Sequence, residues 1–392
     1  MRCYLNTLGM LCAGADSTAA VKDYLSSAKP NLTVSADYSG GTPVPLGICR
    51  GVLPKIPLRE KHWNSRNNQL ALAALAQIQE DVESAIACYG AGRIGVIIGT
   101  STAGIAETEV AIGQWVQQGA TPPDYAYEFQ EMGAPAQFVA QLLKLKGPCY
   151  GISTACSSGA KALAAARRLL QTGLCDAVVA GAVDSLCQLT VRGFSSLEAV
   201  SDDQCNPMSR NRRGINIGEA AALFLVTAEP GGVELCGVGE GSDAYHISAP
   251  EPSGAGAIRC MSEALADAGV EASAIGYVNM HGTATKLNDQ MESRAIEQVF
   301  GLNTPCSSTK PFTGHTLAAA GAIEAGICWL MLQPGEAEFL PVHLWDGETD
   351  PELPAISLVG HDSKPDTELG YVLSNTFAFG GNNIALVFGR VN

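Results

Sequence analysis

The sequence predicts an α/β protein with mostly parallel sheets buried between layers of helices. Short apolar runs alternate with longer segments in which apolar residues recur at helical spacing. The runs 94–99 and 177–182 contain only apolar residues and glycine, which is typical of strands buried on both faces. Apolar residues make up 46% and charged residues 16% of the 392 positions, so the chain can bury a large core.

The elements follow in order along the chain. Residues 1–15 are predicted to form a first strand and turn, because Asn6, Thr7 and Gly9 interrupt the apolar run that a signal peptide needs. Helices are expected at 67–87, 132–145, 159–173, 254–268, 289–300 and 318–332. Strands are expected at 93–99, 148–153, 177–184, 221–227, 233–238, 275–280, 371–374 and 384–388. A second series of elements begins near residue 229, which divides the chain into an N-terminal half, 1–228, and a C-terminal half, 229–392.

Charge and cysteine content exclude several classes of protein. The net charge of −15 argues against nucleic acid and against an anionic membrane surface as partners. No apolar stretch is long enough to span a bilayer. The 13 cysteines show no regular spacing and no CxxC pair, which disfavours a disulfide framework or a structural zinc site. We therefore expect a reducing, cytoplasmic setting.

Cys156 stands at the centre of the most informative segment, residues 151–160. A short apolar run precedes it, and a segment rich in Ala and Leu follows and ends at Gly173. This pattern places Cys156 at a strand-to-helix turn, where the helix dipole and free backbone N–H groups favour the thiolate. The segment thus predicts a nucleophile, although a free cysteine can equally be a small buried apolar residue.

Two histidines downstream have comparable settings. His281, in segment 277–285, follows an apolar run, at the end of a strand where open α/β sheets place ligands. His315 ends segment 307–315 and precedes a helix of small residues. A single histidine in such a place can also be a hydrogen-bonded core residue, so the prediction of catalysis depends on the three segments together.

Together the three segments resemble the β-ketoacyl-[acyl-carrier-protein] synthases, the condensing enzymes of fatty acid and polyketide assembly. Further matches are residues 242–250, 218–219 and 374–383. The resemblance implies a thiolase fold, five-layered αβαβα with two related halves, and a Cys-His-His site. It also implies decarboxylative Claisen condensation of an acyl thioester with malonyl-acyl-carrier protein, without metal or other cofactor. The implied partners are an acyl carrier protein and a second subunit, in a homodimer or a heterodimer with a related ketosynthase-like chain.

The resemblance assigns roles to the residues of the three segments. Cys156 matches the nucleophile that takes the acyl chain. His281 and His315 match the pair that binds the malonyl thioester carbonyl and promotes decarboxylation. Lys310 resembles the lysine that supports the second histidine, and Glu324 resembles the buried glutamate of the same network.

The glycine-rich loop near the C-terminus, residues 379–383, matches the loop that gates the cysteine in this family. Phe379 resembles the gating phenylalanine, and its backbone N–H, with that of Cys156, is expected to form the oxyanion hole. The chain departs from the family pattern at five positions: Ala378, Asn382, Met280, Ala284 and Arg213. None of these changes removes a reacting group. They suggest an altered acyl pocket and gate, and hence an unusual acyl substrate such as a specialised secondary-metabolite chain.

Arg210, Arg212 and Arg213 form a basic cluster in an otherwise acidic chain. One interpretation is docking of the acidic carrier protein, with Lys61 and Arg66 as weaker candidates for the same role. The alternative is a solvated turn, or internal ion pairs.

Two other functions remain possible on the same fold. A thiolase uses a second catalytic cysteine near the C-terminal end of the chain, and the loop 379–383 contains no cysteine. A non-catalytic partner subunit, similar to a chain length factor, shapes an acyl tunnel and usually loses the nucleophile. This chain retains Cys156, His281, His315 and Lys310, which favours catalysis, including as the active half of a heterodimer.

Overall fold

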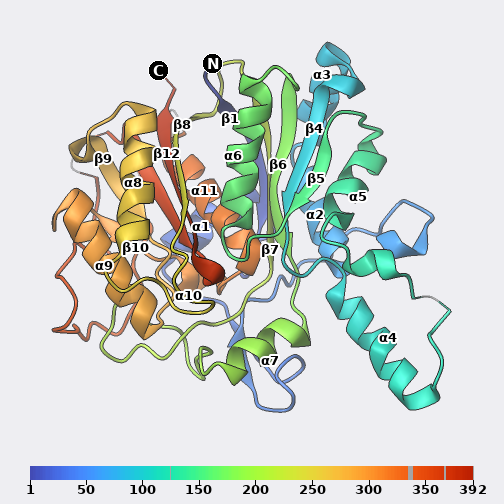
Figure 1. Ribbon diagram of the computed structural model, residues 1–392, viewed down its shortest axis with the longest axis horizontal. Coiled ribbons are helices and arrows are strands. Elements are labelled where there is room, and N and C mark those ends of the chain that lie inside the picture. The colour runs from blue at the N-terminus through green and yellow to red at the C-terminus, as the bar shows by residue number, and fades with distance from the viewer. Residues whose placement is uncertain (124, 334–338, 366–367, 392) are drawn as a thin grey trace.

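The computed structural model describes residues 1–123, 125–333, 339–365 and 368–391. A sheet of ten strands runs through the molecule (Figure 1), in the order β10-β9-β11-β12-β8-β1-β7-β6-β4-β5. One half of it consists of β1 (Tyr4–Leu11), β4 (Ile94–Gly99), β5 (Cys149–Ile152), β6 (Ala177–Asp184) and β7 (Ala220–Thr227). The other half consists of β8 (Val233–Ser242), β9 (Ile275–Asn279), β10 (Cys306–Ser307), β11 (Tyr371–Phe377) and β12 (Asn382–Arg390).

The helices carry the connections between these strands. They are α1 (Thr18–Ser26), α2 (Arg66–Ala76), α3 (Gln79–Tyr89), α4 (Ile105–Gln118), α5 (Ala134–Leu143), α6 (Ser158–Gln171), α7 (Gln188–Ser196), α8 (Ala255–Ala268), α9 (Lys286–Phe300), α10 (Lys310–Thr313) and α11 (Ala320–Met331). A separate hairpin pairs β2 (Thr33–Ser35) with β3 (Val44–Leu46). Strand β1 begins and strand β12 ends at the same end of the molecule, at the top of Figure 1.

Three hydrophobic cores lie between five layers, and the central one fills both sides of the middle layer of helices. In β7, the side chains of Ala222, Phe224 and Val226 join a central core, whereas the alternate residues Leu223 and Leu225 join a core on the opposite face. The first outer core lies against α2 and α5. A third core lies between the C-terminal strands and helices α8 and α9. The order is therefore helices, N-terminal strands, central helices, C-terminal strands, helices.

Helices α6 and α11 form the central layer and contact strands of both halves. The two halves of the sheet meet where β1 pairs with β8, Leu5 opposite Val233. The helices approach closely because small residues line their contact: a Cβ atom added at Gly321 would lie 2.8 Å from the backbone nitrogen of Ala160. This close packing brings the start of α6, which follows Cys156, next to the turn that follows His315.

The structure confirms most predicted elements, corrects two predictions and adds elements that were not predicted. The sheet is mixed, since four of its nine described strand pairs are parallel and five are antiparallel. The helix expected at 67–87 is two helices, α2 and α3, and the sequence did not predict α1, α4, α7, α10 or β10. The division near residue 229 stays a prediction; it falls in the connection between β7 and β8.

Two further findings concern membrane spans and cysteines in the described residues. No described helix is both long and apolar enough to span a membrane. All 13 cysteines are free thiols, as expected from their irregular spacing.

Candidate active site

Cys156 lies in the turn between β5 and α6, as predicted. The preceding residue, Ala155, has a φ of 53°, so the turn is sharp and aims Cys156 back into the molecule. Its side chain is buried, and Sγ lies 3.1 Å from Nε2 of His315. Ser158 fixes the turn because its hydroxyl accepts a hydrogen bond from the backbone N–H of Thr154 at 2.9 Å. Cys156 and His315 therefore form a hydrogen-bonded thiol–imidazole pair.

The expectation of a lowered thiol pKa was wrong. Burial raises the pKa of Cys156 to about 12, because little water reaches the sulfur to solvate a thiolate. The Lys310 ammonium and the backbone N–H groups of Phe379 and Cys156 lower this pKa but do not offset burial. The resting sulfur is a thiol, so reaction requires a base to accept its proton, and His315 is in place to do so.

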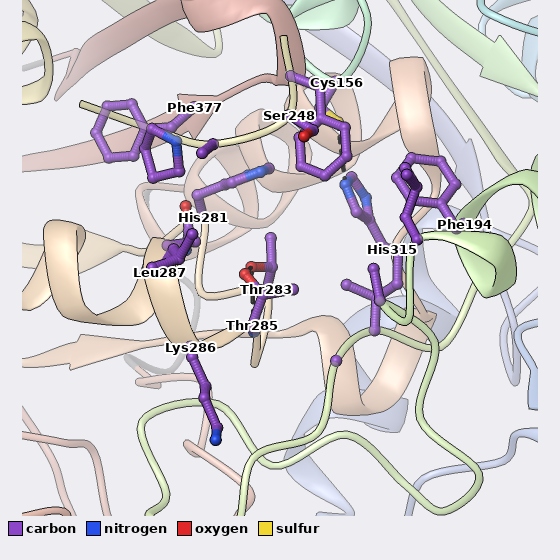
Figure 2. A pocket seen from close by; sticks show the side chains of 18 of the residues that line it. Cys156, Phe194, Ser248, His281, Thr283, Thr285, Lys286, Leu287, His315 and Phe377 are labelled. Atoms are coloured by element: carbon purple, nitrogen blue, oxygen red, sulfur yellow. Dashed lines mark hydrogen bonds between the residues drawn. The ribbon is translucent and has the colours of Figure 1, made fainter. Parts of the chain in front are cut away.

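His281 is held in the loop after β9 by a buried carboxylate. Glu292, from the second turn of α9, accepts hydrogen bonds from the backbone N–H groups of His281 and Gly282, each at 2.7 Å. The imidazole rings of His281 and His315 lie edge to face, with centroids 5.3 Å apart. Figure 2 shows both rings beside Cys156.

His315 is fixed through the backbone on both sides of it. Its backbone N–H donates to the backbone carbonyl of Asn216 at 2.6 Å, and its carbonyl accepts from the backbone N–H of Gly218 at 2.9 Å. The turn that follows is held by Asp184, whose Oδ2 accepts from the backbone N–H of Ala318 at 2.7 Å. The base is therefore positioned by strand-end residues of the N-terminal half, although it belongs to the C-terminal half.

Both imidazoles are neutral at physiological pH. Burial, and secondarily the Lys310 ammonium, hold the pKa of His281 and that of His315 well below the usual range. Neutral imidazoles can accept or donate a proton at Nε2, which is what a base and an oxyanion donor require.

Lys310 contacts a different histidine from the one expected. Its Nζ lies 3.4 Å from Nδ1 of His281, whereas the family resemblance had assigned it to His315. Nζ also donates to Oε1 of Glu324 at 2.5 Å, and both side chains of this ion pair are only 3% exposed. Burial raises the pKa of Glu324 to about 7, and Lys310 opposes that rise. An ammonium donor at Nδ1 leaves the proton of His281 on Nε2, facing the site.

The loop around Phe379 covers the cysteine. The Phe379 ring packs against Phe194, with centroids 5.4 Å apart. Gly380 and Gly381 follow with φ values of 81° and 75°, which glycine adopts without strain. Ala378 has extended backbone, so alanine fits where the family usually has glycine.

A pocket of about 590 Å³ opens onto these residues. Figure 2 shows Cys156 and the histidines at one end, Thr283 and Thr285 further along, and the side chain of Lys286 pointing away from the catalytic group. The lining includes apolar side chains near the cysteine, among them Phe194. A substrate held in this pocket can place its reacting group at the sulfur.

Comparison with known proteins gives the family. The model of the β-ketoacyl synthase N-terminal domain matches residues 49–230, and that of the C-terminal domain matches residues 233–339. The chain belongs to the β-ketoacyl synthase family. It is a ketosynthase-type condensing enzyme of fatty acid or polyketide synthesis, in the acyltransferase class, and its five layers are those of the thiolase fold.

Individual relatives agree over most of the chain. The 3-oxoacyl-[acyl-carrier-protein] synthase 2 of Staphylococcus aureus is 33% identical over 353 residues, which cover 85% of this chain and 86% of the relative. Nodulation protein E of Rhizobium meliloti is 31% identical, covering 100% and 99%. Among solved structures, the complex of the ketosynthase ApeO with its chain length factor ApeC from Xenorhabdus doucetiae matches with a TM-score of 0.94, 44% identity and coverage of 99% and 98%. A β-ketoacyl synthase from Burkholderia phymatum matches with a TM-score of 0.89, 28% identity and full coverage of both chains.

Of the five departures from the family pattern, the pocket lining includes Ala378 and Arg213. Met280 is instead fully buried in the core behind the C-terminal strands. Ala284 is also fully buried, with a φ of 61°, and Asn382 accepts a hydrogen bond from Lys161 at 3.1 Å. The expected effect on the pocket therefore rests on Ala378 and Arg213.

The basic residues proposed for docking are not one group. Arg212 is buried and pairs with Asp350 at 2.5 Å, and Arg66 pairs with the fully buried Glu219 at 2.5 Å. Both arginines therefore form internal ion pairs, which was the alternative interpretation, and their assignment to docking was wrong. Arg210 is exposed and lies 3.6 Å from Glu348. Arg213 and Lys61 are exposed, but only Arg213 lines the pocket of the cysteine.

Two buried carboxylates were missed by sequence reasoning. Glu292 holds the His281 loop. The other oxygen of Asp184, Oδ1, accepts four hydrogen bonds of 2.7–3.0 Å from Thr100, Ser101 and Thr102. Asp184 stands at the end of an otherwise apolar strand, and this position was the one signal of its role in the sequence. A buried carboxylate at a strand end needs hydrogen-bond donors, which a neighbouring loop can supply.

Cys156, His281 and His315 are also the described residues best placed to hold a metal ion, because their ligand atoms lie within 4.8 Å of one another. Thiolate and imidazole are zinc ligands. A thiol with a pKa of about 12 and the Lys310 ammonium beside His281 both oppose a cation there. The arrangement suits nucleophilic and proton-transfer chemistry better than metal binding.

Proposed function

We propose that this chain takes an acyl group onto Cys156 as a thioester and condenses it with malonyl-acyl-carrier protein, releasing CO₂ and a β-ketoacyl carrier product. The observation that carries the proposal is the 3.1 Å contact between Cys156 Sγ and His315 Nε2, with neutral His281 beside them. The name of the Staphylococcus aureus relative, a 3-oxoacyl-[acyl-carrier-protein] synthase, supports this reaction and this carrier.

Acylation begins with proton transfer from Cys156 to Nε2 of His315 as the sulfur attacks the donor thioester. The new S–C bond forms while the C–S bond to the donor breaks, and the proton passes to the departing thiolate. The backbone N–H groups of Cys156 and Phe379 both lie close enough to the sulfur to lower its pKa, which places them beside the carbonyl oxygen of a thioester attacked there. They are suited to stabilise the oxyanion of the tetrahedral intermediate.

Decarboxylation then uses the same imidazoles as donors. The carbonyl oxygen of the malonyl thioester accepts hydrogen bonds from Nε2–H of His281 and from Nε2–H of His315, whose proton moves to Nε2 from Nδ1, unpartnered among the described residues, once the sulfur is acylated. Cleavage of the bond to the carboxylate releases CO₂ and leaves an enolate, whose negative charge these donors stabilise. Lys310 assists by holding the proton of His281 on Nε2.

Condensation completes the cycle. The enolate carbon attacks the carbonyl carbon of the acyl-Cys156 thioester, and the oxyanion again faces the backbone N–H groups of Cys156 and Phe379. Collapse of the intermediate breaks the bond to Sγ, and the thiolate takes a proton from Nε2–H of His315, which is replaced from solvent. The pocket excludes bulk water from the buried trio, which protects the acyl thioester from hydrolysis.

Intact-protein mass spectrometry tests the proposal. Wild type and Cys156→Ala are mixed with a panel of acyl-carrier thioesters of different chain length and unsaturation. We expect a mass gain equal to the acyl group in wild type and none in the variant. Acylation of both proteins, or of neither even after a related subunit is added, would contradict the assignment of Cys156, and the best-loaded chain would identify the acyl class.

We further propose that the chain works as a dimer through the edge of its sheet, with a second copy or with a related ketosynthase-like subunit. Strand β5 ends the sheet and exposes Cys149 and Tyr150, which leaves an edge that a second chain can pair with. Helix α4 also presents apolar side chains to solvent, since Trp115 and Val116 are 53% and 71% exposed. The 44% identity to the ApeO–ApeC complex favours the mixed dimer.

The remaining alternative is that this chain is the non-catalytic partner in such a dimer. The assembled trio with Lys310 argues against it, because a scaffold does not need a thiol hydrogen-bonded to a neutral imidazole. Size-exclusion chromatography with light scattering, followed by the loading assay on each peak, separates these cases. A chain that loads acyl groups only after a related subunit is added is the active half of a heterodimer.

A further inference from the structure

A third buried histidine, His343, has no part in the chemistry described above. It is only 3% exposed, and both nitrogens of its ring have backbone partners. Nδ1 accepts a hydrogen bond from the N–H of Ser308 at 3.1 Å, and Nε2 lies 2.9 Å from the carbonyl oxygen of Pro207. The backbone N–H of His343 donates to the carbonyl of Val359 at 2.9 Å. A buried imidazole with all of its polar groups bonded holds together the segments that it joins.

The two ring contacts determine the protonation of His343. An N–H donor faces Nδ1 and a carbonyl acceptor faces Nε2, so only the neutral ring with its proton on Nε2 satisfies both. Burial lowers the pKa of His343 to about 4, and the hydrogen bond to the Pro207 carbonyl opposes that shift. The ring is therefore neutral at physiological pH, and Nδ1 remains an acceptor for Ser308.

Ser308 connects His343 to the loop that carries His281. The buried hydroxyl of Ser308 donates to the carbonyl oxygen of Gly282, the residue after His281, at 2.8 Å. The same hydroxyl accepts from the backbone N–H of Lys310 at 3.4 Å. Gly282 has a φ of 39°, and a Cβ atom added there would lie 2.5 Å from Cβ of Ser308. The loop after β9 thus packs directly against Ser308.

The two catalytic histidines have different supports. The His281 loop is held at its N–H groups by Glu292 and at the Gly282 carbonyl by Ser308. His315 is held instead through residues 216–218 of the N-terminal half. A change at His343 should therefore disturb His281 more than His315.

We propose that His343 is a positioning residue for His281, acting through Ser308, and that it supports decarboxylation more than acylation of Cys156. The inference rests on the proposed function, in which His281 donates to the enolate and His315 accepts the proton of the cysteine. Without the imidazole, the backbone N–H of Ser308 loses its acceptor, and the carbonyl side of the His281 loop loses a fixed support. A displacement of about 1 Å in a reacting geometry can lower a rate about 100-fold.

Three variants of His343 test the path from His343 through Ser308 to the His281 loop. Leucine removes both ring contacts. The amide oxygen of asparagine can stand near the position of Nδ1 and accept from Ser308, whereas the amide nitrogen of glutamine can stand near Nε2 and donate to Pro207. Release of CO₂ from malonyl-carrier protein measures decarboxylation, and the mass gain of Cys156 measures acylation.

We expect His343→Leu to lower kcat for CO₂ release about 10- to 100-fold, while acylation stays near the wild-type rate. His343→Asn should recover most of this loss, and His343→Gln should not, because only asparagine restores the acceptor for Ser308. Should the leucine variant not fold, the comparison of the two amides decides the question alone. Loss of both steps to the same extent, unchanged CO₂ release, or recovery by glutamine rather than asparagine would overturn the positioning role.

Two controls separate this path from a general effect on the fold. His361→Leu removes an exposed histidine outside the pocket lining and should leave both rates unchanged. Ser308→Ala should lower CO₂ release selectively, and adding His343→Leu should lower it by less than the product of the two single losses, since both act along one path. A loss equal to that product would show that His343 does not act through Ser308. A wild type that, even with a related subunit added, neither takes up acyl groups nor releases CO₂ would instead overturn the proposed function.

Discussion

Replacing Lys310 with methionine leaves Glu324 buried without its cation. Both side chains are 3% exposed, so neither charge is solvated. Breaking a buried pair from one side typically costs about 3–5 kcal/mol. Glu324 limits this loss by taking up a proton, since burial already raises its pKa from 4.5 to about 7. Keeping it neutral in the folded state at pH 7 costs about 3 kcal/mol, at 1.36 kcal/mol for each unit between 4.5 and 7.

The sign of the pH dependence follows from this proton. A carboxyl group whose pKa is raised by folding stabilises the folded state most below its unfolded pKa, and this contribution is lost as pH rises through the folded pKa. In Lys310→Met the raised pKa is no longer opposed by the ammonium, so the destabilisation relative to wild type should grow from pH 5 to pH 8. Urea unfolding at several pH values measures it.

The same change should impair decarboxylation more than acylation. Without a donor at Nδ1, His281 no longer keeps its proton on Nε2, and the enolate loses one of its two hydrogen bonds. Loss of one such donor typically lowers the rate about 100- to 1,000-fold. Acylation depends on His315 and should fall less. Release of CO₂ from malonyl-carrier protein, beside the mass gain of Cys156, separates the two steps.

The double variant Lys310→Met/Glu324→Gln is the matched control, because it removes both charges together. It should recover most of the lost free energy of unfolding but not the rate of decarboxylation. Decarboxylation at the wild-type rate in the stable double variant would refute the role of Lys310 in orienting His281. Equal losses in both chemical steps would show that Lys310 acts only on the fold.

Three further predictions follow from the site. Between pH 8 and pH 6 the rate of Cys156 acylation should show no titration with a pKa near 6.5, because the pKa values of His281 and His315 lie well below 6.5. A pH–rate profile checks this. Glu292→Gln should cost about 1–3 kcal/mol in urea unfolding, because an amide cannot accept both backbone N–H groups of the His281 loop; a smaller cost than that of an exposed Glu→Gln change would contradict this. Ala378→Gly should destabilise the extended backbone by about 0.4–1 kcal/mol and speed amide exchange of the following loop; unchanged exchange would show that Ala378 does not stiffen it.

The reacting residues were predictable because local sequence determines where they stand. Cys156 follows a strand and precedes a helix, and His281 follows a strand, so each occupies a strand end in any packing of these elements. The apolar runs gave the strands, but not their directions. Pairing direction depends on which strands meet in the folded sheet, and here five of nine described pairs are antiparallel.

Properties set by distant neighbours were predicted poorly. The thiol pKa was expected to fall at a helix N-terminus, but burial by the Phe379 loop and the C-terminal half reverses the direction. Arg212 looked like part of a basic surface cluster and Arg66 like a weaker docking candidate, yet each has a carboxylate partner more than 130 residues away in the sequence. A charge run in a sequence contains no information about such partners.

The sequence by itself determined the strand-end positions of Cys156 and His281, the order of the motifs and the reaction class that their combination indicates. Only the tertiary structure decided that Lys310 serves His281, that Asp184 holds the turn after His315, and that Arg213 lines the pocket of the cysteine. The physical reason is how far apart along the chain the residues lie that determine each property. Turns and periodic runs follow from neighbouring residues, whereas solvation, ion pairing and hydrogen bonding depend on which segments the two halves bring into contact.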